Sequence, residues 1–122
     1  SARVLMMNNG APSGFYEDIY GRFGDAPALA FNPGAFVRAG EKPFLEVFYR
    51  GVLRRKTAHL YVEDAVIGRD TLPGEGKGEV KEIISILRCR SFDGVMTLGT
   101  HEGGIVGFKR SAAAFWRLLD EM

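Results

Sequence analysis

Two histidines and a pair of carboxylates stand where a parallel α/β protein places its chemistry. His59 and His101 lie at predicted strand ends, and Glu63 and Asp64 directly follow the strand that carries His59. Histidine titrates near neutral pH and carboxylates exchange protons, so His59, Glu63 and His101 are candidate acid–base residues. The alternative is that each histidine is structural or simply exposed, and that Asp64 is a loop or helix-start partner.

A glycine-rich segment, PGEGKG at 73–78, precedes a predicted helix. Backbone N–H groups of such a loop, together with Lys77, would cradle a phosphate, and Glu75 would lie beside it. The alternative is a turn between a strand and a helix that needs positive φ at several glycines. Cys89 has no histidine or acid nearby in sequence, which favours a packing role.

Short apolar runs alternate with helical patterns along the chain. The runs at 3–7, 28–31, 57–62 and 95–98 predict strands, and residues 32–34 are expected to form a loop. The periodicity predicts helices at 15–23, 43–54 and 80–88 and a last helix capped by Ser111. Between the third strand and the 80–88 helix, a loop is expected. Four such βα units predict an α/β fold with a parallel sheet.

Length and composition predict one domain, residues 1–122, in a reducing compartment. The chain has 16 Lys+Arg, 15 Asp+Glu and a net charge of +1, which argues against nucleic-acid and membrane-surface partners. Its single cysteine excludes an intramolecular disulfide and favours the cytoplasm. No apolar run approaches the ~20 residues of a membrane helix.

Three stretches carry a family resemblance. LAFNPGAFVRAG at 29–40 is similar to the pattern FDPGNFVxAG, and HLYVEDA at 59–65 with LPGEGKG at 72–78 resembles HxHxKDA and LPGEGxG. FDGVMTLGTH at 92–101 resembles YDGxxSLEPH. In this order, the patterns resemble those of the sugar-phosphate isomerase/epimerase (xylose-isomerase-like) superfamily. The resemblance implies the C-terminal half of a (β/α)8 barrel.

The resemblance also implies a divalent metal held by a Glu, an Asp, a His and a Glu after the last four strands. The matching positions here are Met7 or Asn8, Asn32, Tyr61 and Gly99. None of these is a carboxylate or an imidazole, so a hard cation would find almost no charge compensation. The family lysine after the third of these strands is Glu63. We therefore expect no metal and no cofactor.

The expected function is a non-catalytic or small-ligand-binding protein derived from a barrel. A sugar or sugar phosphate would contact the mouth residues, which are Asn8, Asn32, Tyr61, Asp64, Glu75 and Lys77. Two alternatives stay open. One is a metal-free isomerase or epimerase that acts through His59, Glu63 or His101, and the other is the C-terminal subunit of a split isomerase.

A whole barrel of this type takes about 250 residues, so 122 residues supply four of its eight units. Half a barrel leaves two open strand edges and an uncovered sheet face. A homodimer that closes one eight-stranded ring is the expected remedy.

Overall fold

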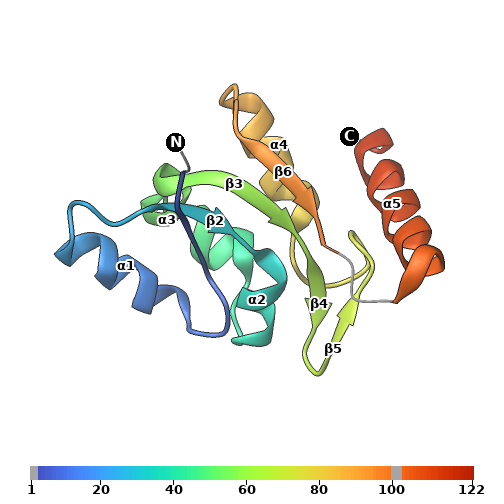
Figure 1. Cartoon of the computed structure of the whole chain (residues 1–122), viewed down its shortest axis with the longest axis horizontal. Helices are drawn as coiled ribbons and strands as arrows, with labels where there is room; N and C mark the ends of the chain where they lie inside the picture. The colour runs from blue at the N-terminus through green and yellow to red at the C-terminus, as the bar shows by residue number, and fades with distance from the viewer. Residues whose placement is uncertain (1–2, 100–102) are drawn as a thin grey trace.

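The computed structural model describes residues 3–99 and 103–122, which form an α/β fold (Figure 1). The elements in chain order are β1 (Leu5–Met7), α1 (Ser13–Arg22), β2 (Ala28–Phe31), α2 (Pro33–Arg38), the π-helical turn η1 (Pro43–Phe48), α3 (Val52–Lys56), β3 (Thr57–Val62), β4 (Asp64–Val66), β5 (Arg69–Thr71), α4 (Val80–Cys89), β6 (Val95–Leu98) and α5 (Gly104–Asp120).

Four strands form one parallel sheet in the order β1-β2-β3-β6. Their order across the sheet is the same as their order along the chain. β4 and β5 pair separately as a small antiparallel hairpin. The predicted parallel sheet is confirmed, while the sheet does not close into a barrel within the residues described above. β1 and β6 are its two outer strands.

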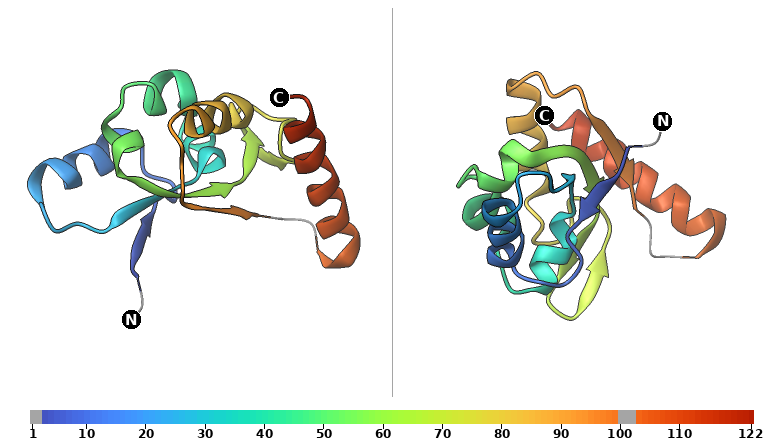
Figure 2. Two further views of the ribbon diagram at one scale, coloured as in Figure 1. Left: turned by 90° about the horizontal axis from the view of Figure 1, so that it is seen from above. Right: turned by 60° about the vertical axis from the view of Figure 1, so that its left-hand side comes forward.

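The core lies between the sheet and the helices on one of its faces. Figure 2 shows α1, α2, α3 and α4 on that face, with α5 standing beside the β6 edge. Phe31 on β2 has no exposed surface and packs its ring against Phe36 and Phe48, with centroids 5.2 and 5.0 Å apart. Leu60 of β3 and Ile83 of α4 are also fully buried in this core.

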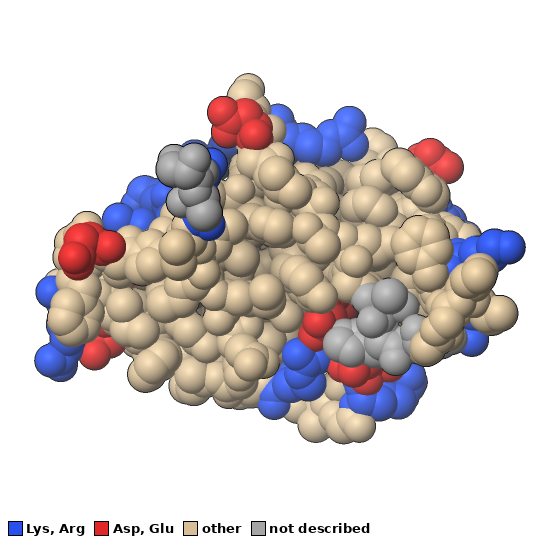
Figure 3. Space-filling model, in the orientation of Figure 1, with Lys and Arg blue, Asp and Glu red and all other residues tan. Residues whose placement is uncertain are grey.

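The other face of the sheet carries the alternate residues. Ala30, His59 and Val95 stand side by side across β2, β3 and β6, and Tyr61 stands beside Thr97. Seen from this side, the centre of the molecule shows no lysine, arginine, aspartate or glutamate, and charge gathers at the rim (Figure 3). No helix covers this face in the part of the chain that the structure describes.

The observed helices differ from the predictions in three places. The helix expected at 43–54 is interrupted, because Gly51 adopts φ 92° between η1 and α3. Residues 33–38 form α2 instead of a loop, since Asn32 caps the helix and Pro33 occupies its first turn. Ser111 does not cap the last helix but is buried in the middle of α5, which begins at Gly104.

The segment expected to be a loop after β3 contains the β4–β5 hairpin. The first strand is shorter than predicted and spans Leu5–Met7, whereas the other three main strands have the predicted bounds.

Candidate functional site

The carboxyl ends of the four parallel strands meet at one edge of the sheet, which we call the mouth. Asn8, Asn32, Glu63 and Gly99 are the first residues after β1, β2, β3 and β6. Ligands of open parallel sheets bind at this edge, because loops from several strands converge there. The mouth is therefore the candidate site.

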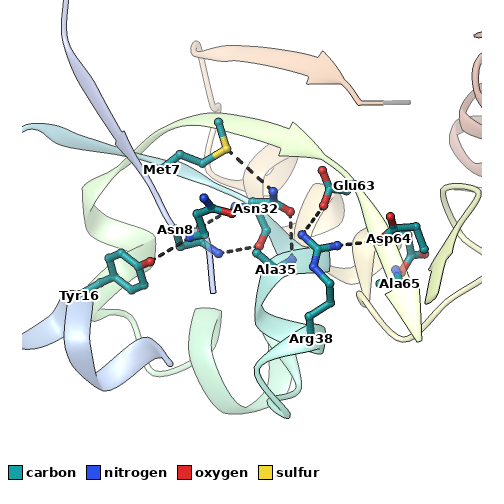
Figure 4. A network of polar contacts seen from close by, with 11 residues as sticks. Met7, Asn8, Tyr16, Asn32, Ala35, Arg38, Glu63, Asp64 and Ala65 are labelled. Atoms are coloured by element: carbon teal, nitrogen blue, oxygen red, sulfur yellow. Dashed lines mark hydrogen bonds and ion pairs between the residues drawn. The ribbon is translucent and has the colours of Figure 1, made fainter. Parts of the chain in front are cut away.

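Asn8 and Asn32 are brought together, as Figure 4 shows, but they bind each other. The fully buried Asn8 donates from Nδ2 to the Asn32 carbonyl at 2.8 Å and accepts from the Asn32 N–H at 2.7 Å. The side-chain amide thus continues the pairing of β1 with β2 by one step. The Asn32 side chain accepts from Ala35 N at 3.2 Å, which caps α2. Both amides hold the fold at the positions where the resemblance expects metal ligands.

Tyr61 and Gly99 fit closely on the two neighbouring strands. A Cβ atom added at Gly99 would lie 2.7 Å from Tyr61 Cε1, well inside contact distance. The Tyr61 ring therefore occupies the space that a side chain at position 99 would need. A carboxylate at 99 would require the ring to move.

Glu63 belongs to an ion-pair cluster that joins three elements. Its side chain is only 5% exposed and accepts from Arg38 Nη2 at 2.6 Å (Figure 4). The same guanidinium donates from Nη1 to Asp70 on β5 at 2.8 Å. Sequence reasoning missed Arg38 and Asp70, because neither the helix α2 nor the hairpin that carries Asp70 was predicted.

A small polar cavity of about 210 Å3 opens beside this cluster. Its lining includes Glu63, Asp70, Thr71, Glu75, Gly99 and Arg110. Thr71 Oγ1 is buried and has no hydrogen-bond partner among the described residues. Carboxylates, a guanidinium and a hydroxyl around one hollow suit a ligand rich in hydroxyl groups, because such a ligand both donates and accepts hydrogen bonds.

Asp64 organises the glycine-rich loop from within. The side chain is buried and accepts four backbone N–H bonds: from Ala65 at 2.8 Å, Gly74 at 2.9 Å, Gly76 at 3.1 Å and Gly78 at 2.7 Å. A Cβ at Gly76 or Gly78 would lie within 2.6 Å of its carboxylate.

The anion in this cradle is therefore the chain's own aspartate. The Lys77 N–H also has a partner, the Ala65 carbonyl at 2.7 Å. The loop presents Glu75 and Lys77 to different hollows. Glu75 lines the cavity at the mouth, whereas Lys77 lines a separate cavity of about 380 Å3 with Lys42 and Lys81. Of the expected mouth residues, Asp64 lines this second cavity with Lys77, and Glu75 does not.

His59 lies inside β3 and not at its end, which corrects the expectation from sequence. Four steps along an extended strand lead from it to Glu63, a distance of about 13 Å. His59 is half-buried, with Ala30 and Val95 as its neighbours in the sheet, and Nε2 is buried without a hydrogen-bond partner in the described part of the chain. His101 lies outside the described residues. His59 and Glu63 are thus too far apart to share a proton directly.

No group of three or more His, Cys, Asp or Glu side chains in residues 3–99 and 103–122 is arranged to hold a metal ion. Over the same residues, none of the helices has the length and apolar character needed to cross a membrane. Comparisons with protein-family models, with curated proteins and with solved structures find no match to the chain.

Proposed function

We propose that this chain is one half of a (β/α)8 barrel whose mouth binds a small polar ligand of the sugar or sugar-phosphate class, without a metal and without catalysis. The observation that carries the proposal is the polar cavity at the carboxyl ends of parallel strands, beside the Glu63–Arg38–Asp70 cluster. A cavity of about 210 Å3 limits the ligand to a small one.

Two features support a half-barrel. The strands follow one another in the order β1-β2-β3-β6, and the helices that connect them lie on one face of the sheet (Figure 2). A (β/α)8 barrel has this arrangement in each of its halves, with helices outside and strand residues packed inside. An ordinary doubly wound sheet has helices on both faces.

Three features support a mouth without metal chemistry. Asn8 and Asn32 are neutral and bound to each other, Tyr61 fills the space beside Gly99, and Glu63 is engaged by Arg38. A divalent cation needs several oxygen ligands with net negative charge that converge on one point. These side chains instead contact neighbouring parts of the chain at the ends of the strands.

Calorimetric titration tests both parts of the proposal. With Mn²⁺ or Zn²⁺ we expect no site tighter than roughly millimolar, since a tight site needs converging charged ligands. A panel of small sugars and sugar phosphates should include a saturable ligand, and Glu75→Gln should weaken its binding about tenfold or more, the loss expected for one charge-assisted hydrogen bond.

Glu82→Gln is the matched control, because Glu82 is exposed on α4 and does not line the cavity at the mouth. It should bind the same ligand as the unmodified chain does. A stoichiometric micromolar metal site, or isomerase turnover that survives chelation, would contradict the proposal. So would the absence of binding by every member of the panel.

A further inference from the structure

The last helix, α5, exposes large apolar side chains outside the part of its surface that it buries. Its buried side is formed by Gly107, Ser111, Ala114 and Leu118. Ile105, Phe108 and Trp116 lie outside that side, about 60–140° around the helix from Ser111, and are 72%, 56% and 63% exposed. At 100° per residue, these three side chains fall within one sector of about 80°. We call them the α5 stripe.

The first helix, α1, carries a second exposed stripe at the other end of the molecule. Phe15 is 55% exposed, and Ile19 lies one turn later on the same side of the helix. Phe23, which is 57% exposed, is the first residue after the helix. We call these three residues the α1 stripe. Figure 1 shows α1 and α5 at opposite ends of the sheet, so one stripe cannot cover the other within a chain. Single exposed apolar residues are ordinary, whereas a grouped set on a helix marks an interaction surface.

Each stripe belongs to a helix beside an open edge of the sheet. α1 follows β1, and α5 follows β6, and these are the two outer strands. In a (β/α)8 barrel each helix covers its own strand and the next one around the ring. The strand after β6 is missing from the four-stranded sheet, and so is the helix that would pack beside α5.

We infer that a second copy of this chain supplies both the strand that would follow β6 and the helix that would pack beside α5. A two-fold rotation about an axis parallel to the strands keeps the strand direction, so β6 of one copy meets β1 of the other in parallel. The same rotation makes the second junction identical to the first, and eight strands close a ring with no open edge. At each junction the α5 stripe of one copy packs against the α1 stripe of the other. The uncharged open faces then line the inside of the ring (Figure 3).

The exposed area is consistent with a missing partner. The chain exposes 7126 Å2, whereas a compact monomer of 13.4 kDa is expected to expose roughly 6,500 Å2. The excess approaches the ~800 Å2 that each partner of a standard interface buries. A second copy also offers what this edge requires, which is a parallel strand with its helix on the outer face.

Light scattering on single substitutions tests the inference. The unmodified chain at micromolar concentration should have twice the 13.4 kDa mass of one copy. Trp116→Glu and Phe15→Glu each place a charge in both junctions and should raise the dissociation constant at least a hundredfold. Val106→Glu is the matched control, because Val106 is 69% exposed on the charged side of the same helix and should leave the mass unchanged.

The double variant Phe15→Lys with Trp116→Glu keeps the test decisive if a single substitution also unfolds the chain. It places opposite charges across both junctions and should restore the double mass in the folded state, as judged by circular dichroism. A single-copy mass for the unmodified chain would overturn the inference, as would a mass above two copies or equal effects of Trp116→Glu and Val106→Glu.

The inference rests on the half-barrel of the proposed function, but ligand titration reports on the mouth alone, so either can fail while the other holds.

Discussion

The glycine-rich loop and the two helix stripes differ in whether the chain itself supplies their interaction partners. The loop has several backbone N–H groups to satisfy, and the Asp64 carboxylate accepts four of them inside the chain. The stripes on α1 and α5 leave large apolar side chains in solvent within the described structure. A group that is already satisfied has little to offer a ligand, whereas an uncovered apolar surface gains from a partner. The loop that the sequence singles out as an anion cradle thus binds the chain's own aspartate, whereas the surface that we propose for a second copy lies on helices that carry no motif.

The largest effect is expected at Asp64. In Asp64→Asn an NH2 group replaces one carboxylate oxygen, so the N–H groups on that side face a donor and lose their acceptor. We expect the free energy of unfolding to fall by about 3–5 kcal/mol, since each unsatisfied buried donor costs about 1–3 kcal/mol. Urea denaturation followed by circular dichroism measures the change.

Asp25→Asn, in an exposed turn, is the control for Asp64→Asn and should change stability by less than about 0.5 kcal/mol. If Asp64→Asn were as mild as this control, the loop amides would not depend on Asp64. The loop would then be available to an external anion, and the contrast between the two regions would fail.

Asn8→Ala tests a second buried polar side chain whose hydrogen bonds are made within the chain. It removes both bonds to the Asn32 backbone and leaves a small cavity at a fully buried position. The free energy of unfolding should fall by about 2–3 kcal/mol. Asn9→Ala, at the exposed neighbouring position, should have an effect below about 0.5 kcal/mol. Equal denaturation midpoints for the two variants would show that Asn8 does not hold β1 against β2.

Gly99→Ala tests the close fit at the mouth. The new Cβ would lie 2.7 Å from the Tyr61 ring, so we expect a loss of about 1–3 kcal/mol from overpacking. Tyr61→Leu should remove most of that penalty, which a double-mutant cycle would report as a coupling of about 1 kcal/mol. Strictly additive effects would mean that the ring does not occupy the space beside position 99.

The smallest effect concerns Tyr20, which ties α1 to the body of the chain. Its hydroxyl donates to the Pro27 carbonyl at 2.7 Å, and burial raises the pKa of the phenol above its ordinary value of about 10. The stabilisation is therefore complete below the unfolded pKa and is lost as the pH rises through the folded pKa. Tyr20→Phe should lower stability by about 1 kcal/mol at neutral pH and flatten the decline above about pH 10. If the stability of the variant fell with rising pH as steeply as that of the unmodified chain, groups other than Tyr20 would cause the alkaline loss.

The strands were the most predictable part of the fold. Runs such as ALAF and TAHLYV are short, apolar and bounded by breakers, so 28–31, 57–62 and 95–98 could be located from local pattern alone. Asn32-Pro33-Gly34 looks like a turn, yet the same residues start a helix when asparagine is the cap and proline takes the first turn. The β4–β5 hairpin escaped prediction because its first residue, Asp64, is fixed by bonds to glycines ten or more positions later.

The site was predictable only as a set of strand ends. Position after a strand identified Glu63, and the family resemblance identified Asn8 and Asn32. All three directly follow strands of the parallel sheet. What each side chain does there depends on register and on distant elements. Asn8 reaches Asn32 only because β1 lies beside β2, and the partners of Arg38 come from two other elements. The spacing of residues along the sequence does not predict such pairings.

Cross-linking between separately substituted chains tests the closed ring most directly. Phe15→Cys and Trp116→Cys are made in different chains, each with Cys89→Ser, so that a link can form only between copies. After mixing and re-equilibration, a short bis-maleimide should join the two chains in high yield, whereas pairing Phe15→Cys with Val106→Cys should give little product. Equal, low yields from both pairs would contradict the meeting of α1 and α5 across two copies, and with it the half-barrel dimer.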